Sequence, residues 1–260
     1  MQTVYLLLER KGIGTLFLRR KYCYQSRSAH GKIQVQDTVE AGVPVRLLLV
    51  NGTRESATYL IPGLLNEPVF EYIRVITRMT DEMENNADVL LIGGAGFSLP
   101  KHFISRYPGM TMDVIENNPE MLELARKYFF LEELYRDFDL HNTGRLNIVL
   151  DDGMKYLETS KKKYDMIIND AFVGRVADRG LSSDKGSRLV YDRLKDGGTY
   201  FVNLITAREG FDSMNGIMAE SIISRVFGKA AMIPVYPDYD AGLKQNVIVR
   251  AIKEAPAVNA

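Results

Sequence analysis

From residue 88 onward, short apolar runs alternate with segments whose apolar positions recur at helical spacing. The run Val89–Ile92 has no polar position, which is typical of a strand that is covered on both faces. Similar runs follow at 111–115, 146–150, 164–168 and 199–205, and two more at 230–235 and 246–252 close the series. Such alternation of strands and helices predicts an α/β domain with a mainly parallel, doubly wound sheet.

The first 80 residues have a different pattern. Short β-type runs at 4–8, 15–18, 33–35 and 45–50 are separated by turn-forming segments such as Asn51-Gly52, which favours antiparallel hairpins. Apolar positions within 67–79 predict a helix, and the polar, acidic stretch 80–87 follows it. We therefore expect two domains: residues 1–80, a small β-hairpin domain with a connecting helix, and residues 81–260, a Rossmann-like nucleoside-binding domain.

The amino-acid composition argues against several classes of protein. The 260 residues include 46% hydrophobic residues, enough for a large core, and 33 basic residues balance 33 acidic ones. The lack of a basic excess argues against a nucleic-acid partner, and no apolar run approaches the length of a membrane span. The single cysteine, Cys23, allows no intrachain disulfide, and the three histidines lie far apart. We expect a soluble, cytoplasmic protein with no metal site.

A glycine-rich turn provides the first candidate for chemistry. Gly93, Gly94 and Gly96 follow the first strand of the large domain, and Glu116 ends the next strand, twenty-three positions beyond Gly93. In a nucleotide-binding βαβ unit, glycines let the backbone approach the ligand, and the acid hydrogen-bonds a ribose hydroxyl. The pattern therefore predicts a nucleoside site formed by these four residues.

Two further strand ends carry acids. Asp151 and Asp152 follow the run 146–150, and Asp170 follows the run 164–168. Ligands of doubly wound sheets bind outside the carboxyl ends of the strands, so we expect these acids to lie near Glu116. An acid after a strand can also cap the next helix, and for Asp151 and Asp152 both roles stay open.

The motifs resemble those of the spermidine synthase family, the polyamine aminopropyltransferases. The resemblance is carried by DVLLIGGAGFS, DVIENNPEMLELARKYF, LDDGMKYL, YDMIINDAF and LKDGGTYFVNLI, in the order of the family. It is strongest with a bacterial branch that has Asp-Ala-Phe where this chain has Asp170-Ala171-Phe172. The resemblance implies a methyltransferase-type fold with a seven-stranded sheet and a small N-terminal β domain, and often a homodimer.

The resemblance also implies roles for individual residues. Glu116 would bind the ribose hydroxyls of the donor nucleoside, Asp152 would accept from the adenine amino group, and Asp170 would be the catalytic acid facing the amine. Asp165, in the Tyr-Asp strand opening, is interpreted as structural. The implied reaction transfers an aminopropyl group from decarboxylated S-adenosylmethionine, or uses S-adenosylmethionine itself, with a putrescine-like amine as acceptor.

The chain departs from the family at several positions. Gly96 replaces the acid that grips the terminal ammonium of the donor, and Phe97 replaces a glycine. Val173 and Gly174 replace the end of an Asp-Ser-Ser-Asp-Pro motif, Glu55 stands where the family often has Gln, and neither Tyr59 nor Tyr72 matches the tyrosine of the amine channel. Possible substitutes are Asp178 and Asp184 as additional acids, and Phe97, Phe129 and Phe172 as groups that exclude water, although core packing is the favoured role for Phe129.

Three interpretations follow from these departures. The first is an aminopropyltransferase-like enzyme. The second is another S-adenosylmethionine-dependent transferase, most simply a methyltransferase, because the acid that repels a donor carboxylate is missing at Gly96. The third is a catalytically inert, nucleoside-binding relative, because the amine site has lost acids.

Overall fold

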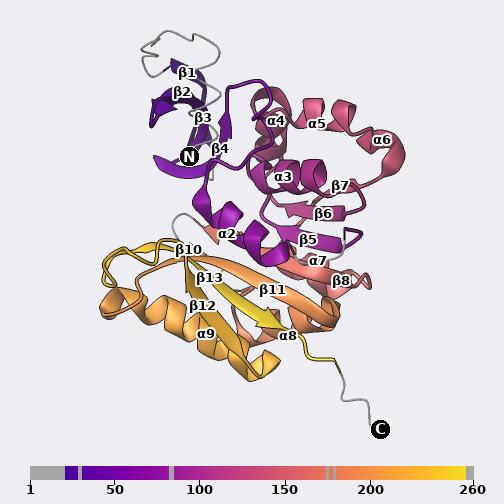
Figure 1. The fold of residues 1–260 in the computed structure, drawn as a ribbon, viewed down its shortest axis with the longest axis vertical. Coiled ribbons are helices and arrows are strands. Elements are labelled where there is room, and N and C mark those ends of the chain that lie inside the picture. Colours follow the sequence, from indigo (N-terminus) through magenta and orange to yellow (C-terminus); the bar gives the residue numbers. More distant parts are fainter. Residues whose placement is uncertain (1–20, 29–30, 82–84, 174–175, 178–179, 256–260) are drawn as a thin grey trace.

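The computed structural model describes residues 21–28, 31–81, 85–173, 176–177 and 180–255. The predicted strands at 4–8 and 15–18 lie outside these residues. A small N-terminal sheet stands beside a larger sheet that is covered by helices (Figure 1). Among the described residues, no helix combines the length and the hydropathy that crossing a membrane requires.

The N-terminal sheet is an antiparallel meander. Its strands pair in chain order: β1 (Lys21–Ser28), β2 (Gly31–Glu40), β3 (Val43–Val50) and β4 (Thr53–Tyr59). Two-residue turns, Ala41-Gly42 and Asn51-Gly52, join the last three strands, and all four residues have positive φ, as in type I′ turns. The predicted hairpins are confirmed for the strands at 33–35 and 45–50. β1 and β4 were missed because both are mostly polar and lack an apolar run.

The larger sheet has seven strands in the order β12-β13-β11-β8-β5-β6-β7. The five from β11 to β7 are parallel, and β13 runs antiparallel to both β11 and β12. The predicted doubly wound, seven-stranded sheet is therefore confirmed. The strands are β5 (Asp88–Ile92), β6 (Thr111–Glu116), β7 (Leu146–Leu150), β8 (Tyr164–Asn169), β11 (Leu194–Thr206), β12 (Ala230–Pro234) and β13 (Gln245–Ile252).

Helices cover both faces of this sheet. Along β5, Val89 and Leu91 belong to one core cluster, whereas Leu90 and Ile92 belong to another. This is why the strand has no polar position. The first cluster takes side chains from α2 (Glu71–Thr80), α3 (Ser98–Arg106), α4 (Pro119–Tyr128), α5 (Leu131–Asp137) and α6 (Leu140–Thr143); the second takes them from α7 (Gly153–Thr159), α8 (Asp184–Arg193) and α9 (Met214–Phe227), which follows the short 3-10 helix η1 (Phe211–Ser213).

The two sheets share packing. Ile33, Val35 and Leu48 of the small sheet form one cluster with Met121 and Leu124 of α4. The helix α2 contributes four side chains to the core of the large sheet: Tyr72, Ile73, Val75 and Ile76. The small sheet therefore lies against the helix that follows Glu116, and the predicted domain boundary at residue 80 falls at the end of α2.

Helix α8 ends earlier than the sequence pattern indicated. The sequence at 185–195, followed by Gly197-Gly198, is typical of a helix closed by glycine, but α8 ends at Arg193, and Leu194 is already extended at the start of β11. Gly197 has φ +80°, and the pairing of β11 with β8 shifts register between Leu194 and Thr199. The two glycines therefore form an irregularity within a strand. The short pair β9 (Phe172–Val173) and β10 (Val176–Ala177) was also missed.

Candidate active site

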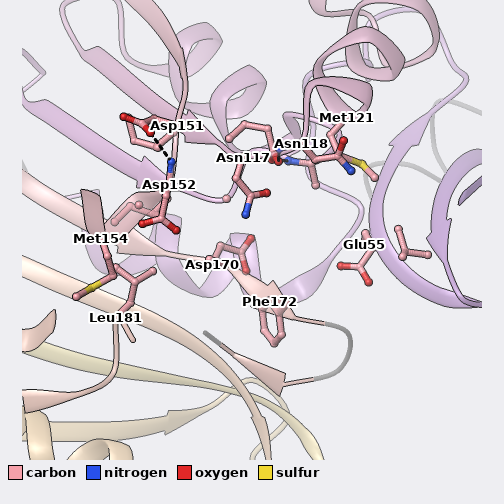
Figure 2. A pocket seen from close by; sticks show the side chains of 18 residues that line it. Glu55, Asn117, Asn118, Met121, Asp151, Asp152, Met154, Asp170, Phe172 and Leu181 are labelled. Atoms are coloured by element: carbon pink, nitrogen blue, oxygen red, sulfur yellow. Dashed lines mark hydrogen bonds between the residues drawn. The ribbon is translucent and has the colours of Figure 1, made fainter. Parts of the chain in front are cut away.

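A cavity of about 370 Å³ lies at the carboxyl ends of β5, β6, β7 and β8. This is the edge at which open α/β sheets bind ligands. Figure 2 shows Asp152, Asn117, Asp170 and Glu55 around it. Five of the seven predicted site residues line it: Gly93, Glu116, Asp151, Asp152 and Asp170. Gly94 and Gly96 are not among the lining residues.

The glycine turn lies under the cavity, and neither Gly93 nor Gly94 has room for a side chain. Gly93 has φ +97°, and a Cβ there would be 2.6 Å from the carbonyl oxygen of Asp170. A Cβ on Gly94 would be 3.0 Å from the ring of Phe97. The chain can therefore pass from β5 into α3 beside Asp170 only with small residues at these positions.

Glu116 joins the glycine turn to the end of β6. Its Oε2 accepts from the amides of Gly94 (3.0 Å) and Ala95 (2.9 Å), and its Oε1 accepts from the amide of Asn118 (2.8 Å). An ionised carboxylate has about four acceptor positions, so about one remains for a ligand in the cavity. Asn118 in turn caps α4 by accepting from the amide of Glu120, and Pro119 begins the helix.

Asp151 and Asp152 follow β7 and differ in their contacts. Asp152 caps α7: its Oδ1 accepts from the amide of Lys155 at 2.9 Å. Asp151 accepts from the amide of Asp152 (2.9 Å) and pairs with the Lys155 ammonium (2.8 Å), and these bonds hold the pKa of its carboxyl below the usual value. Capping occupies Oδ1 of Asp152, while the residue as a whole lines the cavity.

Asp170 sits in a network of polar side chains beyond the end of β8. The Tyr72 hydroxyl donates to its Oδ2 at 2.7 Å, and the Asn203 amide donates to its Oδ1 at 2.8 Å. Asn203 also accepts from Asn246 of β13 at 2.9 Å. Burial raises the pKa of Asp170 to about 6, although both hydrogen bonds favour the ionised form. The network gives the carboxylate a fixed orientation and a pKa close to neutral pH.

A second cavity of about 370 Å³ adjoins the first. The two share four lining residues: Glu55, Ala95, Asp170 and Phe172. The remaining wall comes from the small sheet, α2, and the strands β11 and β13, with Glu40, Arg54, Glu71, Tyr72, Asn203, Tyr236 and Asn246 among its polar residues. Asp170 and Glu55 therefore lie at the junction of the two cavities.

Glu55 extends from β4 into this junction. Burial, and next the negative charge of Asp170, raise the pKa of Glu55 to about 7. The sequence identified Glu55 only as a departure from Gln and gave it no role. Tyr72, Asn203 and Asn246 were missed as site residues as well, because nothing in the local pattern of α2, β11 or β13 distinguishes them from structural positions.

Several sequence expectations for the pocket are wrong. Phe97 is fully buried in the core beneath the turn and does not line either cavity. Phe129 is buried in the core, the role that was favoured for it. Asp184 lies at the start of α8, paired with Arg188, away from both cavities. Asp178 lies outside the described residues. Phe172 alone of the three proposed phenylalanines reaches the site.

Asp165 has the structural role that was expected for it. Asp165 accepts from the amide of Asp88 (2.8 Å) and pairs with Lys195 (2.8 Å) at the opposite ends of β5 and β8 from the cavities, which is a structural role. Within the described part of the chain, no three His, Cys, Asp or Glu residues are grouped as a metal site requires.

The comparisons with known proteins agree with this architecture. A family model described as "Spermine/spermidine synthase domain" matches residues 69–241. A polyamine aminopropyltransferase of Methanocaldococcus jannaschii is 25% identical over 176 residues, covering 67% of this chain and 55% of that protein. Polyamine aminopropyltransferase 2 of Pseudomonas aeruginosa is 25% identical over 224 residues, covering 84% of this chain and 60% of its own. The chain spans about half the length of the curated relatives it matches.

Solved structures show the same fold. A probable spermidine synthase from Corynebacterium glutamicum has a TM-score of 0.71 at 20% identity, covering 93% of this chain and 83% of its own. A spermidine synthase in complex with the transition state analogue AdoDATO has a TM-score of 0.68 at 20% identity, covering 92% of this chain and 75% of its own. Human methyltransferase-like protein 13 in complex with SAH has a TM-score of 0.56 at 17% identity, and the match covers 74% of this chain and 86% of the human chain. The fold is therefore of the methyltransferase type.

Proposed function

The chain belongs to the spermine/spermidine synthase family, and from that premise we propose that it transfers an aminopropyl group from decarboxylated S-adenosylmethionine to a small, putrescine-like amine. The observation that carries the proposal is the meeting of two cavities at Asp170. A transferase of this kind needs a nucleoside site and an amine site that share one reacting point. The two cavities provide that arrangement.

The first cavity would hold the nucleoside of the donor. Glu116 already binds the glycine turn, and its remaining acceptor position suits a ribose hydroxyl. Asp152, with Oδ1 in the cap of α7, would accept from the adenine amino group through Oδ2. Gly93 leaves the turn low enough for the ligand to lie across it. The sulfonium end of the donor would then point toward Asp170.

The second cavity would hold the acceptor amine. An alkylamine has a pKa of about 10.4, so at neutral pH only about one molecule in a few thousand is the free base. The Asp170 carboxylate would orient the amine and take its proton. The pKa of Asp170, about 6, places the carboxyl near the operating range of a general base, which contributes roughly 10²–10⁴ to a rate.

The proposed step is a single displacement. The amine nitrogen forms a bond to the carbon beside the sulfonium, the carbon–sulfur bond breaks, and its electron pair stays on sulfur as the neutral thioether of methylthioadenosine. The proton of the amine passes to Asp170. Because the sulfonium charge disappears in this step, a cavity partly shielded from water favours the transition state, and Phe172 forms part of its wall.

We also propose that the protein acts as a homodimer in the cytoplasm. Exposed apolar side chains on η1 and α9 support self-association: Phe211 is 92% exposed, and Met214, Ile217 and Met218 follow it on α9. The single cysteine supports a reducing compartment. Light scattering coupled to size-exclusion chromatography tests the dimer, and a monomer at micromolar concentration contradicts it.

The central experiment compares three ligands by calorimetry and then measures turnover. We expect decarboxylated S-adenosylmethionine to bind at least as well as S-adenosylmethionine, methylthioadenosine to bind as the product, and spermidine-type product to form with a diamine. Tighter binding of S-adenosylmethionine together with methyl transfer would identify a methyltransferase instead. Binding of methylthioadenosine without any turnover would identify a catalytically inert, nucleoside-binding relative, and failure of all three ligands to bind would contradict the nucleoside site itself.

A further inference from the structure

Seven acidic side chains line the two cavities, and six of them have partners. Among the described residues, Glu55 is the only one of the seven for which there is no hydrogen bond or ion pair. The partners are Arg54 for Glu40, Arg74 and Arg78 for Glu71, backbone amides for Glu116, Lys155 for Asp151 and Asp152, and Tyr72 with Asn203 for Asp170. A half-buried carboxylate without a partner is costly unless a ligand satisfies it.

The position of Glu55 defines where such a ligand must lie. Glu55 lines both cavities, and its side chain projects from β4 into the space that Asp170 faces from the other side (Figure 2). Both reacting substrates of the proposed transfer must pass through this junction. A cationic group on either substrate would therefore meet the Glu55 carboxylate.

The packing of the glycine turn explains why an acid stands on β4 and not on the turn. A Cβ on Gly96 would lie 2.6 Å from Oγ of Ser56, which is itself buried and hydrogen-bonded to Ser98 at 2.8 Å. An acidic side chain at position 96 has no room there. The pairing of β4 with β3 shifts register here: Leu48 pairs with Ser56 and Leu49 pairs with Arg54, so Glu55 is the extra residue of a β-bulge, an irregularity that can redirect a side chain. Ser56 packs against the turn, and Glu55 lines the cavity.

We infer that Glu55 forms an ammonium subsite at the junction, where its carboxylate binds the primary ammonium of a substrate in a charge-assisted hydrogen bond. The ammonium can come from the aminopropyl arm of the donor or from the acceptor amine. This inference rests on the proposed function and adds a binding residue to it. The Glu55 carboxylate would also repel the carboxylate of S-adenosylmethionine. The absence of an acid at Gly96 therefore no longer favours S-adenosylmethionine over its decarboxylated form.

Burial and the charge of Asp170 place the pKa of Glu55 in a range where its ionisation can be followed through the pH dependence of binding. With the pKa of Glu55 near 7, the carboxyl loses its proton between about pH 6 and 8, whereas a primary ammonium stays protonated over that range. The affinity of this site for a primary ammonium should therefore increase as the pH rises from 6 to 8. The other groups facing this region are Asp170 beyond β8, Tyr72 and Glu71 on α2, Arg54 on β4, Glu40 on β2 and Tyr236 after β12.

The test compares Glu55→Gln with the parent protein. We expect Glu55→Gln to bind decarboxylated S-adenosylmethionine roughly ten- to hundredfold more weakly at pH 8, or to raise the KM of the amine by a similar factor. The first result assigns the subsite to the donor and the second to the acceptor. Methylthioadenosine lacks the ammonium, so its affinity should stay within about twofold. In the parent, the affected affinity should rise between pH 6 and 8, and Glu55→Gln should lose the part of that rise centred near pH 7.

Two controls make the result decisive. Glu123→Gln makes the same change of charge on the exposed side of α4, outside both cavities, and should leave all affinities and their pH dependence unchanged. Thermal melting reports folding: Glu55→Gln should melt at a higher temperature than the parent at pH 8 and by a much smaller margin at pH 5, because it removes a charge that folding disfavours.

The outcomes separate this inference from the proposed function. If Glu55→Gln leaves donor affinity, amine KM and their pH dependence unchanged while methylthioadenosine binds and turnover continues, the ammonium subsite is wrong and the transfer stands. If the parent protein binds methylthioadenosine as tightly as decarboxylated S-adenosylmethionine and shows no turnover, both the ammonium subsite and the proposed transfer are wrong.

Discussion

The two cavities at the edge of the large sheet are built in different ways. The first is lined mainly by residues that directly follow strands β5 to β8, and Gly93, Glu116 and Asp152 all lie within 60 residues of one another in the chain. The second joins Glu40 of β2, Tyr72 of α2 and Asn246 of β13, which are spread over more than 200 residues of the chain. A local sequence pattern can therefore specify the proposed nucleoside site, whereas the proposed amine site depends on how distant segments pack.

The partners of the acids differ in the same way. In the first cavity, Glu116 and Asp152 accept from backbone amides, so each holds a loop or helix in place. In the second cavity, Asp170 accepts from the side chains of Tyr72 and Asn203. Substitutions should therefore alter backbone order and nucleoside affinity in the first cavity, and pKa values and turnover in the second.

The largest effect is expected for Asp170→Asn, at the junction of the cavities. Asn keeps the size of the side chain but cannot accept the proton of the amine, so turnover should fall by roughly 10²–10⁴. Donor affinity should change by less than about threefold, because the contacts of the nucleoside remain. Steady-state kinetics and calorimetry check this, with Asp192→Asn on the exposed side of α8 as the control. Unchanged turnover removes Asp170 from the mechanism.

Glu116→Gln is the corresponding test of the first cavity. Gln offers one acceptor oxygen where three backbone amides now donate, so the turn at 93–97 should lose order and methylthioadenosine should bind roughly ten- to hundredfold more weakly. Calorimetry measures the affinity, and amide hydrogen exchange at Gly94 and Ala95 measures the order. Glu123→Gln again provides the matched control. Weaker nucleoside binding without faster exchange at these two amides contradicts the proposed link.

Tyr72→Phe should shift a pH profile by a smaller amount. The hydrogen bond from Tyr72 favours ionised Asp170, so its loss should raise the pKa of Asp170 above about 6, by roughly one unit. The acid limb of kcat/KM should move to higher pH by that amount. Turnover should be several-fold lower at pH 6.5 and close to the parent value at pH 8.5. Tyr59→Phe, which removes a hydroxyl bonded to Arg74, should leave the limb in place. A uniform loss at every pH would mean that Tyr72 acts only through packing.

The smallest effect on activity is expected for Lys101→Met, between the two sheets. Lys101 of α3 is 1% exposed, its ammonium donates to Thr58 and to the carbonyl of Leu65 at 2.9 Å each, and burial lowers its pKa to about 7. The unfolded chain keeps this proton up to about pH 10.5, so the folding stability contributed by Lys101 rises from pH 7 toward pH 10 and is lost as pH falls toward 7.

We expect Lys101→Met to remove that slope, which amounts to roughly 2–4 kcal/mol across the range, and to change kcat by less than about twofold. Denaturant unfolding at pH 7, 8 and 9 measures the slope, and Lys163→Met at an exposed position provides the control. A slope that persists in Lys101→Met assigns it to other groups.

The residues that were missed share one physical property. Glu55, Tyr72 and Asn203 stand on elements whose apolar positions pack in the core, and nothing in their own segment shows which way a polar side chain points. For Gly96 and Phe97 the reverse holds: their place in a glycine motif predicted that they line the ligand site. Gly96 packs against Ser56 and Phe97 packs in the core beneath the turn, so both lie below the cavity. A motif located the turn but not the direction of each side chain.

The sequence by itself determined the order of strands and helices in the large domain, the hairpins, the glycine turn after the first strand of that domain and the acids at three further strand ends. These features depend on local backbone geometry and on apolar periodicity, which are properties of neighbouring residues. Only the tertiary structure decided that Glu55 and Asp170 share one junction, that Tyr72 and Asn203 hold Asp170, and that Phe97 is core. Such contacts depend on how β4, α2 and β13 pack against the end of β8, and short-range patterns carry no record of that packing.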